Sequence, residues 1–190
     1  MPKQKNLTRE QILEAAFELV RVEGVSGLTA RALAKALGTS TSPIFGHFSS
    51  MAEMLPHLKA RAEAKLREYQ TTTRTGEPFL DMGLGYIDFA RREPRLFWEL
   101  LGNAGRANEC EGREFGKTHL AAMRKDPRLA GLDDGALFSI LLKMWIFVHG
   151  MASLSKADAI ALGDDENIRR MLLEVGSAVI DSALKERDKK

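Results

Sequence analysis

A short stretch rich in hydroxyl side chains is the part of this 190-residue sequence best suited to contact another molecule. The segment Thr39–Ser50, TSTSPIFGHFSS, combines serines and threonines with a proline, a histidine and two phenylalanines. Small hydroxyls at a helix start can approach base edges and phosphates closely, and a helix N-terminus favours a phosphate. The segment therefore predicts the base-contacting end of a DNA-binding helix; the alternative is a capped loop with a core histidine.

The side chains of this segment have different expected roles. Ser40 is expected to cap the helix, and Pro43 suits the first turn, where its missing N–H would have no partner in any case. Phe45 could lie against a thymine methyl group or a sugar, and His47 could donate to a phosphate. The residues expected to face the DNA bases are Ser40, Thr41, Ser42 and Pro43.

The elements that position these side chains form a predicted helix-turn-helix. Thr29 caps a short helix, and Gly38 can take the positive φ that the following turn needs. Ala34 lets the two helices approach closely, and Ile44 would pack between them. An ordinary pair of helices with a glycine turn has the same features, so this spacing alone leaves both interpretations open.

Periodic apolar residues predict an all-α chain of about nine helices. Thr8 and Gln11 form a capping box for the first helix, and Gly24 ends it. Ser50 with Glu53 is expected to cap a long helix that runs to about residue 73. No β-branched alternation of four or more positions predicts a strand. Later helices are expected at about residues 79–92, 94–101, 113–125, 133–156 and 165–185.

The segment Leu28–Leu55, LTARALAKALGTSTSPIFGHFSSMAEML, resembles the N-terminal DNA-binding domain of the TetR (tetracycline-repressor) family of transcriptional regulators. The resemblance extends back through TREQILEAAFELVRVEGVSGLT, from Thr8. It implies a homodimeric, ligand-responsive regulator, typically a repressor, that leaves a palindromic operator when an effector binds. It also implies phosphate contacts by Thr29 and His47, with the helix start at 40–43 on the bases.

Three positions depart from the family pattern. Phe45 stands where a tyrosine is usual, Met51 where a lysine is usual and Thr39 where a valine is common. The first two changes remove groups that reach the DNA backbone. The basic residues Lys3 and Lys5 could partly compensate, and basic residues slightly outnumber acidic ones in the first 60. A helical small-molecule-binding protein with weak or lost DNA binding therefore stays as the alternative.

Two domains are expected. Residues 1–55 would form the DNA-binding domain, a helix at about 50–73 would link the domains, and residues 76–190 would bind the ligand and form the dimer. The segment Lys143–Leu154, KMWIFVHGMASL, resembles the Trp-x-x-x-His-Gly (WHG) segment of one C-terminal subgroup of the family. Trp145 and His149 share a helix face, where they are either a pocket wall or plain core. The candidate pocket residues are Tyr86, Phe89, Trp98, His119, Trp145 and His149.

The last two long helices carry apolar residues on more than one face, which predicts a four-helix dimer interface. One stripe contains Ile140, Leu141, Met144, Val148 and Ala152, and Leu137, Leu142, Ile146 and Phe147 widen it. Gly150 is expected to allow a close approach between helices. The alternative is a large monomer core.

Other classes of protein fit poorly. GLGYID at 83–88 lacks the third glycine and the preceding strand of a dinucleotide loop, and Cys110 lies in an expected loop with no histidine near it in sequence. No enzyme activity, cofactor or metal site is predicted. The start lacks an apolar signal segment, and no apolar run approaches 18 residues, so no membrane span and a cytoplasmic location are expected. The expected partners are double-stranded DNA, a largely apolar effector and a second copy of the chain.

Overall fold

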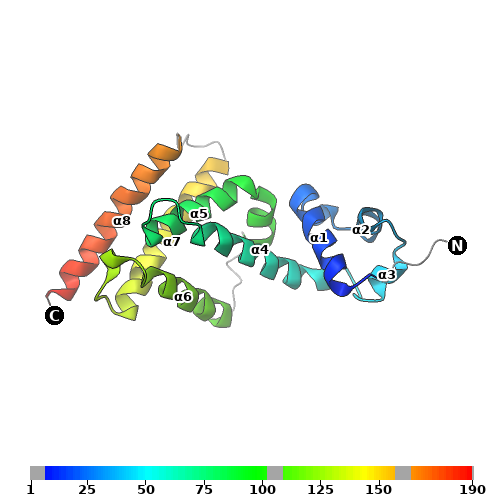
Figure 1. Cartoon of the computed structure of the whole chain (residues 1–190), viewed down its shortest axis with the longest axis horizontal. Helices are drawn as coiled ribbons and strands as arrows, with labels where there is room; N and C mark the ends of the chain where they lie inside the picture. Colours follow the sequence, from blue (N-terminus) through cyan, green and yellow to red (C-terminus); the bar gives the residue numbers. More distant parts are fainter. Residues whose placement is uncertain (1–6, 102–108, 157–163, 190) are drawn as a thin grey trace. The chain divides into compact units, whose positions relative to one another are not determined.

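The computed structural model describes residues 7–101, 109–156 and 164–189. These residues form eight α-helices and one π-helical segment, with 3₁₀ turns between some of them and no strand (Figure 1). The all-α fold and the nine expected helices are confirmed. By contacts the chain divides into two compact units, which we describe separately.

The N-terminal unit contains the helix-turn-helix. It is built from α1 (Arg9–Glu23), α2 (Ala30–Leu37), α3 (Ser42–Phe45) and the first part of α4 (Leu55–Thr71). The unit also takes in residues 93–104, whose described part includes the π-helical segment Leu96–Leu101. A boundary inside α4 and this returning segment both differ from the continuous domains expected from sequence.

The returning segment is held to α1 by two carboxylates. Arg21 donates from Nε and Nη2 to the two carboxylate oxygens of Glu93, at 2.6 and 2.8 Å. Glu93 is buried, and it raises the pKa of the Arg21 guanidinium through these hydrogen bonds and its charge. Glu99 accepts from the backbone N–H of Val25 at 2.6 Å. These contacts explain why residues 93–101 belong with a domain that precedes them by many residues.

Most predicted helix ends of this unit are confirmed. Thr8 and Gln11 form both hydrogen bonds of the capping box, and the Thr29 side chain accepts from the Ala32 N–H. Gly24 and Gly38 end their helices with φ of 82° and 65°. Local side-chain chemistry therefore sets these ends as expected.

Three predicted helix starts shift. The helix expected to begin at Ser40 begins at Ser42, and Thr41 at the N-cap position makes no side-chain cap hydrogen bond. Ser50 does accept from the Glu53 N–H at 3.3 Å, but a 3₁₀ turn follows and α4 begins at Leu55. The helix expected from residue 113 begins at 109, which places the backbone of Cys110 in a helix rather than a loop.

The C-terminal unit packs the end of α4 with α5 (Pro78–Arg92), α6 (Glu109–Met123), α7 (Asp134–Lys156) and α8 (Asp165–Arg187). Helix α5 contacts α6, α7 and α8, and α7 contacts α6 and α8. Its core is formed by apolar residues of α5, α7 and α8, among them Ile87, Phe89, Leu137, Ile140, Leu172 and Ile180.

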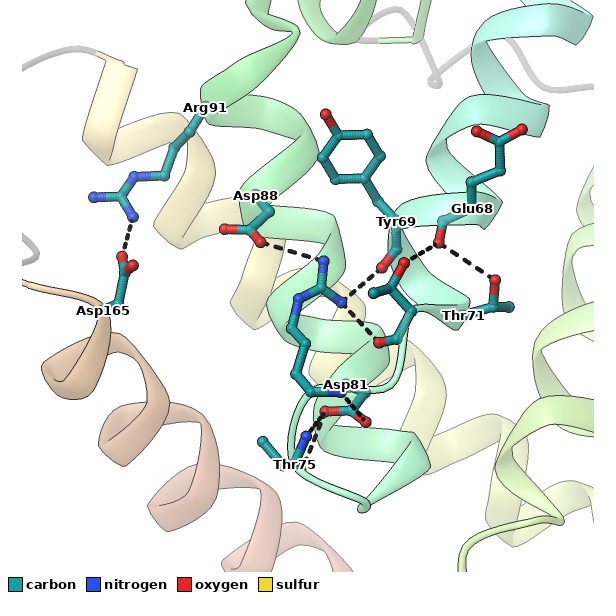
Figure 2. Close-up of polar contacts among 10 residues, drawn as sticks. Glu68, Tyr69, Thr71, Thr75, Asp81, Asp88, Arg91 and Asp165 are labelled. Carbon is teal, nitrogen blue, oxygen red and sulfur yellow. Dashed lines mark hydrogen bonds and ion pairs between the residues drawn. The ribbon is translucent and has the colours of Figure 1, made fainter.

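Two buried aspartates fix the N-terminal end of α5. Asp81 accepts from the backbone N–H groups of Arg74 and Thr75 and from the Thr75 hydroxyl, at 2.7–3.1 Å (Figure 2). Asp126 accepts from the Phe79 N–H at 3.2 Å and from Arg128. Burial alone would raise the pKa of each carboxyl group, but these hydrogen bonds and the neighbouring arginine lower it below its usual value.

Gly85 marks the closest approach between α4 and α5. A Cβ atom built there would lie 2.2 Å from the carbonyl oxygen of Tyr69, whereas one built at Gly150 would meet nothing within 4 Å. Gly85 therefore serves the close helix approach that the sequence pattern predicted for Gly150; within this chain the Gly150 prediction is wrong. Both glycines of GLGYID lie inside α5, so this segment forms a helix and not a loop.

Helix α7 is more apolar than its place in one chain requires. By length and composition Asp134–Leu154 could cross a membrane, a test that core helices of soluble proteins also pass. Only 39% of its most apolar window is buried within the chain. The predicted stripe Ile140, Leu141, Met144, Val148 and Ala152 is buried in this unit's own core, not left for a partner. The exposed apolar side chains are Phe138, Leu142, Ile146 and Leu154.

Candidate functional site

The hydroxyl-rich end of the helix-turn-helix lies on the surface. Ser40 and Ser42 are exposed, Thr41 and Pro43 are half-buried, and the Phe45 ring is 51% exposed. Below them Ile44 and Phe48 are 0% and 1% exposed, so they anchor α3 to the unit's core. The four predicted base-facing positions are therefore exposed or half-buried at the start of α3 and in the two residues before it, and Phe48 is core as predicted.

The electrostatics of this surface favour a polyanion. No aspartate or glutamate occurs between Glu23 and Glu53, a span that holds the whole helix-turn-helix. Arg31 and Lys35 lie exposed on α2, Arg31 in its first turn and Lys35 in its last turn, beside Gly38. The sequence interpretation missed both cations, although the acid-free span could have indicated them. Such cations without nearby carboxylates favour phosphate contacts.

His47 is engaged with the start of the chain. Its Nε2–H donates to the Leu7 carbonyl oxygen at 2.8 Å, so a phosphate contact by this N–H would require that bond to break. Arg9 lies with its guanidinium carbon 4.7 Å from the centre of the Phe48 ring. These contacts hold the residues just before α1 against the end of α3. Lys3 and Lys5 lie outside the described residues.

The remaining predicted DNA contacts lie on other elements. Thr29 is exposed at the N-cap of α2, where its hydroxyl already accepts from Ala32. Met51 is half-buried before the 3₁₀ turn. Hydrogen bonds from the hydroxyl and backbone of Ser49 lower the pKa of Glu53, the first acidic group after the acid-free span. A lysine is therefore absent and a carboxylate is present at this point of the N-terminal unit.

A second candidate site lies in the C-terminal unit. A cavity of about 40 Å³ has a wall of apolar side chains interrupted by four hydrogen-bonding ones. We call it the polar cavity. Its lining consists of Gln70, Phe79, Met82, Gly83, Tyr86, His119, Leu141, Met144, Trp145 and Val148.

The structure brings four of the six predicted pocket residues together here. Tyr86, His119 and Trp145 line the cavity, and His149 contacts Tyr86 and Trp145 without lining it. The Tyr86 hydroxyl is 2.9 Å from Nδ1 of His149, whose ring stacks on Trp145 with centroids 5.6 Å apart. The two other predicted residues do not line the cavity. Phe89 packs edge-on against Tyr69, and Trp98 belongs to the N-terminal unit beside Phe97.

The polar side chains that line the polar cavity form hydrogen bonds with one another. Nε2–H of the buried His119 lies 3.3 Å from Oε1 of Gln70. Burial raises the pKa of the Tyr86 hydroxyl, and a hydrogen bond from Trp145 offsets part of that rise. Tyr86 therefore stays protonated at neutral pH and can donate. Gln70 was missed in the sequence because it lies on α4, outside the domain expected to hold the pocket.

The cavity is small for a ligand site. Its volume of about 40 Å³ holds about three water molecules, whereas sites for drug-sized ligands measure about 300–1,000 Å³. A ligand of that size would have to move side chains or helices apart. Flexible methionines at Met82 and Met144 are the side chains best able to move.

Comparisons with known proteins match both parts of the chain. Residues 12–58 match the family described as bacterial regulatory proteins, tetR family, and residues 79–175 match the tetracyclin repressor-like C-terminal domain. Neither match names the Trp-His-Gly subgroup, which stays a prediction.

Curated relatives match over part of their length. An uncharacterized HTH-type transcriptional regulator, YobS of Bacillus subtilis, is 29% identical over 48% of this chain and 50% of its own. The nucleoid occlusion factor SlmA of Haemophilus ducreyi is 31% identical over 55% of each chain. This chain thus spans about half the length of these relatives.

Solved structures share the whole fold. A TetR regulator of Streptomyces coelicolor has a TM-score of 0.59 at 23% identity, covering 95% of this chain and 93% of its own. A protein of unknown function from Rhodococcus sp. RHA1 has a TM-score of 0.63 at 21% identity, covering 98% of both chains. A TetR variant from Acinetobacter baumannii AYE, in complex with minocycline, has a TM-score of 0.57 at 20% identity, covering 95% and 98%.

Proposed function

Because this chain belongs to the tetR family of bacterial regulatory proteins, we propose that it is a cytoplasmic transcriptional repressor that binds a palindromic operator and leaves it when a small-molecule effector binds. The observation that carries the proposal is the exposed hydroxyl end of α3, anchored by Ile44 and Phe48 within a span free of acidic residues. Ser40, Thr41, Ser42, Pro43 and Phe45 would contact bases. Arg31, Lys35, Thr29 and His47 would contact phosphates.

The chain would act as a homodimer through α7 and α8. Phe138, Leu142, Ile146 and Leu154 are 41–60% exposed on α7. The first three lie at four-residue intervals and Leu154 follows Ile146 by eight, so the four residues form a stripe along one helix face that a second helix pair can bury. A dimer would also place two copies of the short α3 on a two-fold symmetric site, since one short helix contacts few bases.

The effector would enter the polar cavity of the C-terminal unit. The cavity has the mostly apolar wall and the few converging polar groups that are typical of ligand sites. An effector of drug-like size would be larger than the cavity, so its binding would change the packing of α5 and α7. We propose that this change lowers the affinity for the operator.

DNA binding is tested with fragments from upstream of the protein's own gene. We expect footprinting to show two half-sites separated by a whole number of turns, about 34 Å each. Arg31→Ala and Lys35→Ala should each weaken binding, and the slope of log K against log salt should fall by about 0.9 for each phosphate that is no longer neutralised. Arg67→Ala, a change of an exposed arginine in the other unit, is the matched control.

Two results would contradict the proposal. Footprinting that shows a single half-site, bound by one subunit, would contradict the proposal that the protein binds its operator as a dimer. Equal binding to all fragments, unchanged by Arg31→Ala and Lys35→Ala, would favour the alternative of a small-molecule-binding protein that has lost its operator.

A further inference from the structure

A second cavity shares part of its wall with the polar cavity. It measures about 20 Å³ and lies against α8, where Leu172, Gly176 and Ile180 line it. We call it the α8 cavity. Phe79, Gly83 and Met144 line both cavities. These three residues therefore form a wall that the two cavities share.

Met144 is the movable part of the shared wall. Its terminal methyl carbon lies 3.8 Å from the position that a Cβ atom of Gly176 would take, so the side chain reaches across to α8. A methionine has three rotatable bonds and no branch, so it can change rotamer at little cost. Its displacement would join the two cavities into one elongated space.

The two ends of this joined space differ in chemistry. The end in the polar cavity has Gln70, Tyr86, His119 and Trp145 in its wall. The α8 end is mainly aliphatic, and Arg128 at its edge is already paired with Asp126 at 2.7 Å and with Glu77 at 2.5 Å. Among the described residues that line the polar cavity, none is Asp, Glu, Lys or Arg. A full charge buried there would lack an ionic partner, which is costly.

We propose that the joined space binds an uncharged, elongated, apolar molecule, with a hydroxyl or carbonyl oxygen held at the polar cavity and its chain running past Gly83 and Met144 toward α8. This proposal rests on the proposed function, because it names the class of effector for the same site. The oxygen would accept from the Gln70 amide or exchange hydrogen bonds with Tyr86. The apolar chain would replace Met144 between α7 and α8.

The test uses simple probes on the full-length chain. Trp98→Phe leaves Trp145 as the one remaining tryptophan, so fluorescence reports the cavity wall. Straight-chain alcohols from 1-hexanol to 1-decanol should bind with affinities that rise about fourfold per methylene. Decanoate and decyltrimethylammonium, which have similar chains but carry charges, should bind more than about a hundredfold more weakly than 1-decanol.

A glycine substitution tests the path of the chain. A Cβ at Gly83 would lie 3.6–3.7 Å from Leu172 and Val148, which is ordinary contact, so Gly83→Ala should fold. The added methyl narrows the shared wall and should weaken 1-decanol binding about fourfold or more, with little effect on 1-hexanol. Gly135→Ala is the control, because Gly135 is exposed in the first turn of α7 and lines neither cavity.

The outcomes separate this proposal from the proposed function. Tighter binding of either charged probe, no binding of the alcohols, or equal effects of both glycine variants would overturn the ligand class. Alcohol binding with the expected chain-length dependence supports it. If 1-decanol binds but leaves operator affinity unchanged in fluorescence anisotropy, the ligand class stands and the effector role fails.

Discussion

The start of α5 is fixed over a much longer distance along the chain than the helix starts of the N-terminal unit. Helices α7 and α8 of the C-terminal unit are capped locally by Asp133 and Asp164, so α5 is the exception. In the N-terminal unit Thr8, Thr29 and Ser50 each accept from a backbone N–H three residues ahead. In the C-terminal unit the first turn of α5 is capped by Asp126, which lies 47 residues from its partner Phe79. Local caps can be recognised in a sequence, whereas a cap that arrives from another helix requires the fold. Each unit contains one of the two tryptophans, so each can be followed separately.

The largest effect should come from the closest helix contact. Gly85→Ala places a methyl 2.2 Å from the Tyr69 carbonyl oxygen, and we expect it to destabilise the C-terminal unit by about 3 kcal/mol or more. Urea unfolding followed by Trp145 fluorescence, in the Trp98→Phe background, measures the change. Gly135→Ala, at an exposed position in the first turn of α7, should instead change stability by less than about 1 kcal/mol. Equal midpoints for the two variants would show that Gly85 is not a point of close approach.

A smaller effect is expected at the long-range cap. Asp126→Asn keeps the shape but weakens the hydrogen bonds from Phe79 and Arg128, and should cost about 1–3 kcal/mol at neutral pH. The folded pKa of Asp126 is lowered, so its stabilisation is present above the unfolded pKa of about 3.9 and is lost as pH falls through the folded pKa. Wild type should therefore lose more stability than the variant between about pH 5 and pH 2.

The control for this pH dependence is Asp181→Asn, on the exposed surface of α8. It should leave the acid-side slope of the urea midpoint unchanged. Parallel pH profiles for wild type and Asp126→Asn would mean that the carboxyl has no special stability in the folded chain.

A local turn should be less sensitive. Gly38 has φ of 65°, and nothing lies within 4 Å of an added Cβ, so only backbone strain opposes Gly38→Ala. We expect a loss of about 1–2 kcal/mol in the N-terminal unit. Gly38→Asn should cost less, because asparagine tolerates the left-handed region. Urea unfolding followed by Trp98 fluorescence in a Trp145→Phe background measures the change in the free energy of unfolding. Equal losses of stability in Gly38→Ala and Gly38→Asn would contradict the explanation by backbone strain.

The smallest stability change is expected at Met51. Met51→Lys puts a cation near the start of α4, which should cost about 0.3–1 kcal/mol. It should bind DNA more tightly, with the salt slope steeper by about 0.9 for each phosphate that the new lysine neutralises in each subunit. Anisotropy titrations at several salt concentrations measure the slope. An unchanged slope would mean that this turn does not approach the DNA backbone.

The separation in sequence between interacting residues also explains which features could be predicted from the sequence. Helix number, the caps at Thr8 and Thr29, and the positive φ of Gly38 follow from neighbouring residues, and all are confirmed. The pairing of His119 with Gln70 and the close approach at Gly85 depend on which helices meet, which no local pattern contains. The stripe on α7 shows the limit most clearly. Its apolar residues can be recognised in the sequence, but only packing shows that Val148 faces the core while Ile146 faces outward.

The returning segment at residues 93–101 has a consequence for how the chain is made. Arg21 and Val25, near the start, find their partners in Glu93 and Glu99. When residue 65 leaves the ribosome, α1, α2 and α3 have been synthesised, but Glu93 and Glu99 have not yet emerged. Domains tend to fold as they emerge during translation. Here the N-terminal unit can make its contacts with Glu93 and Glu99 only after α5 has been synthesised, so α1 to α3 emerge well before the carboxylates that hold Arg21 and Val25.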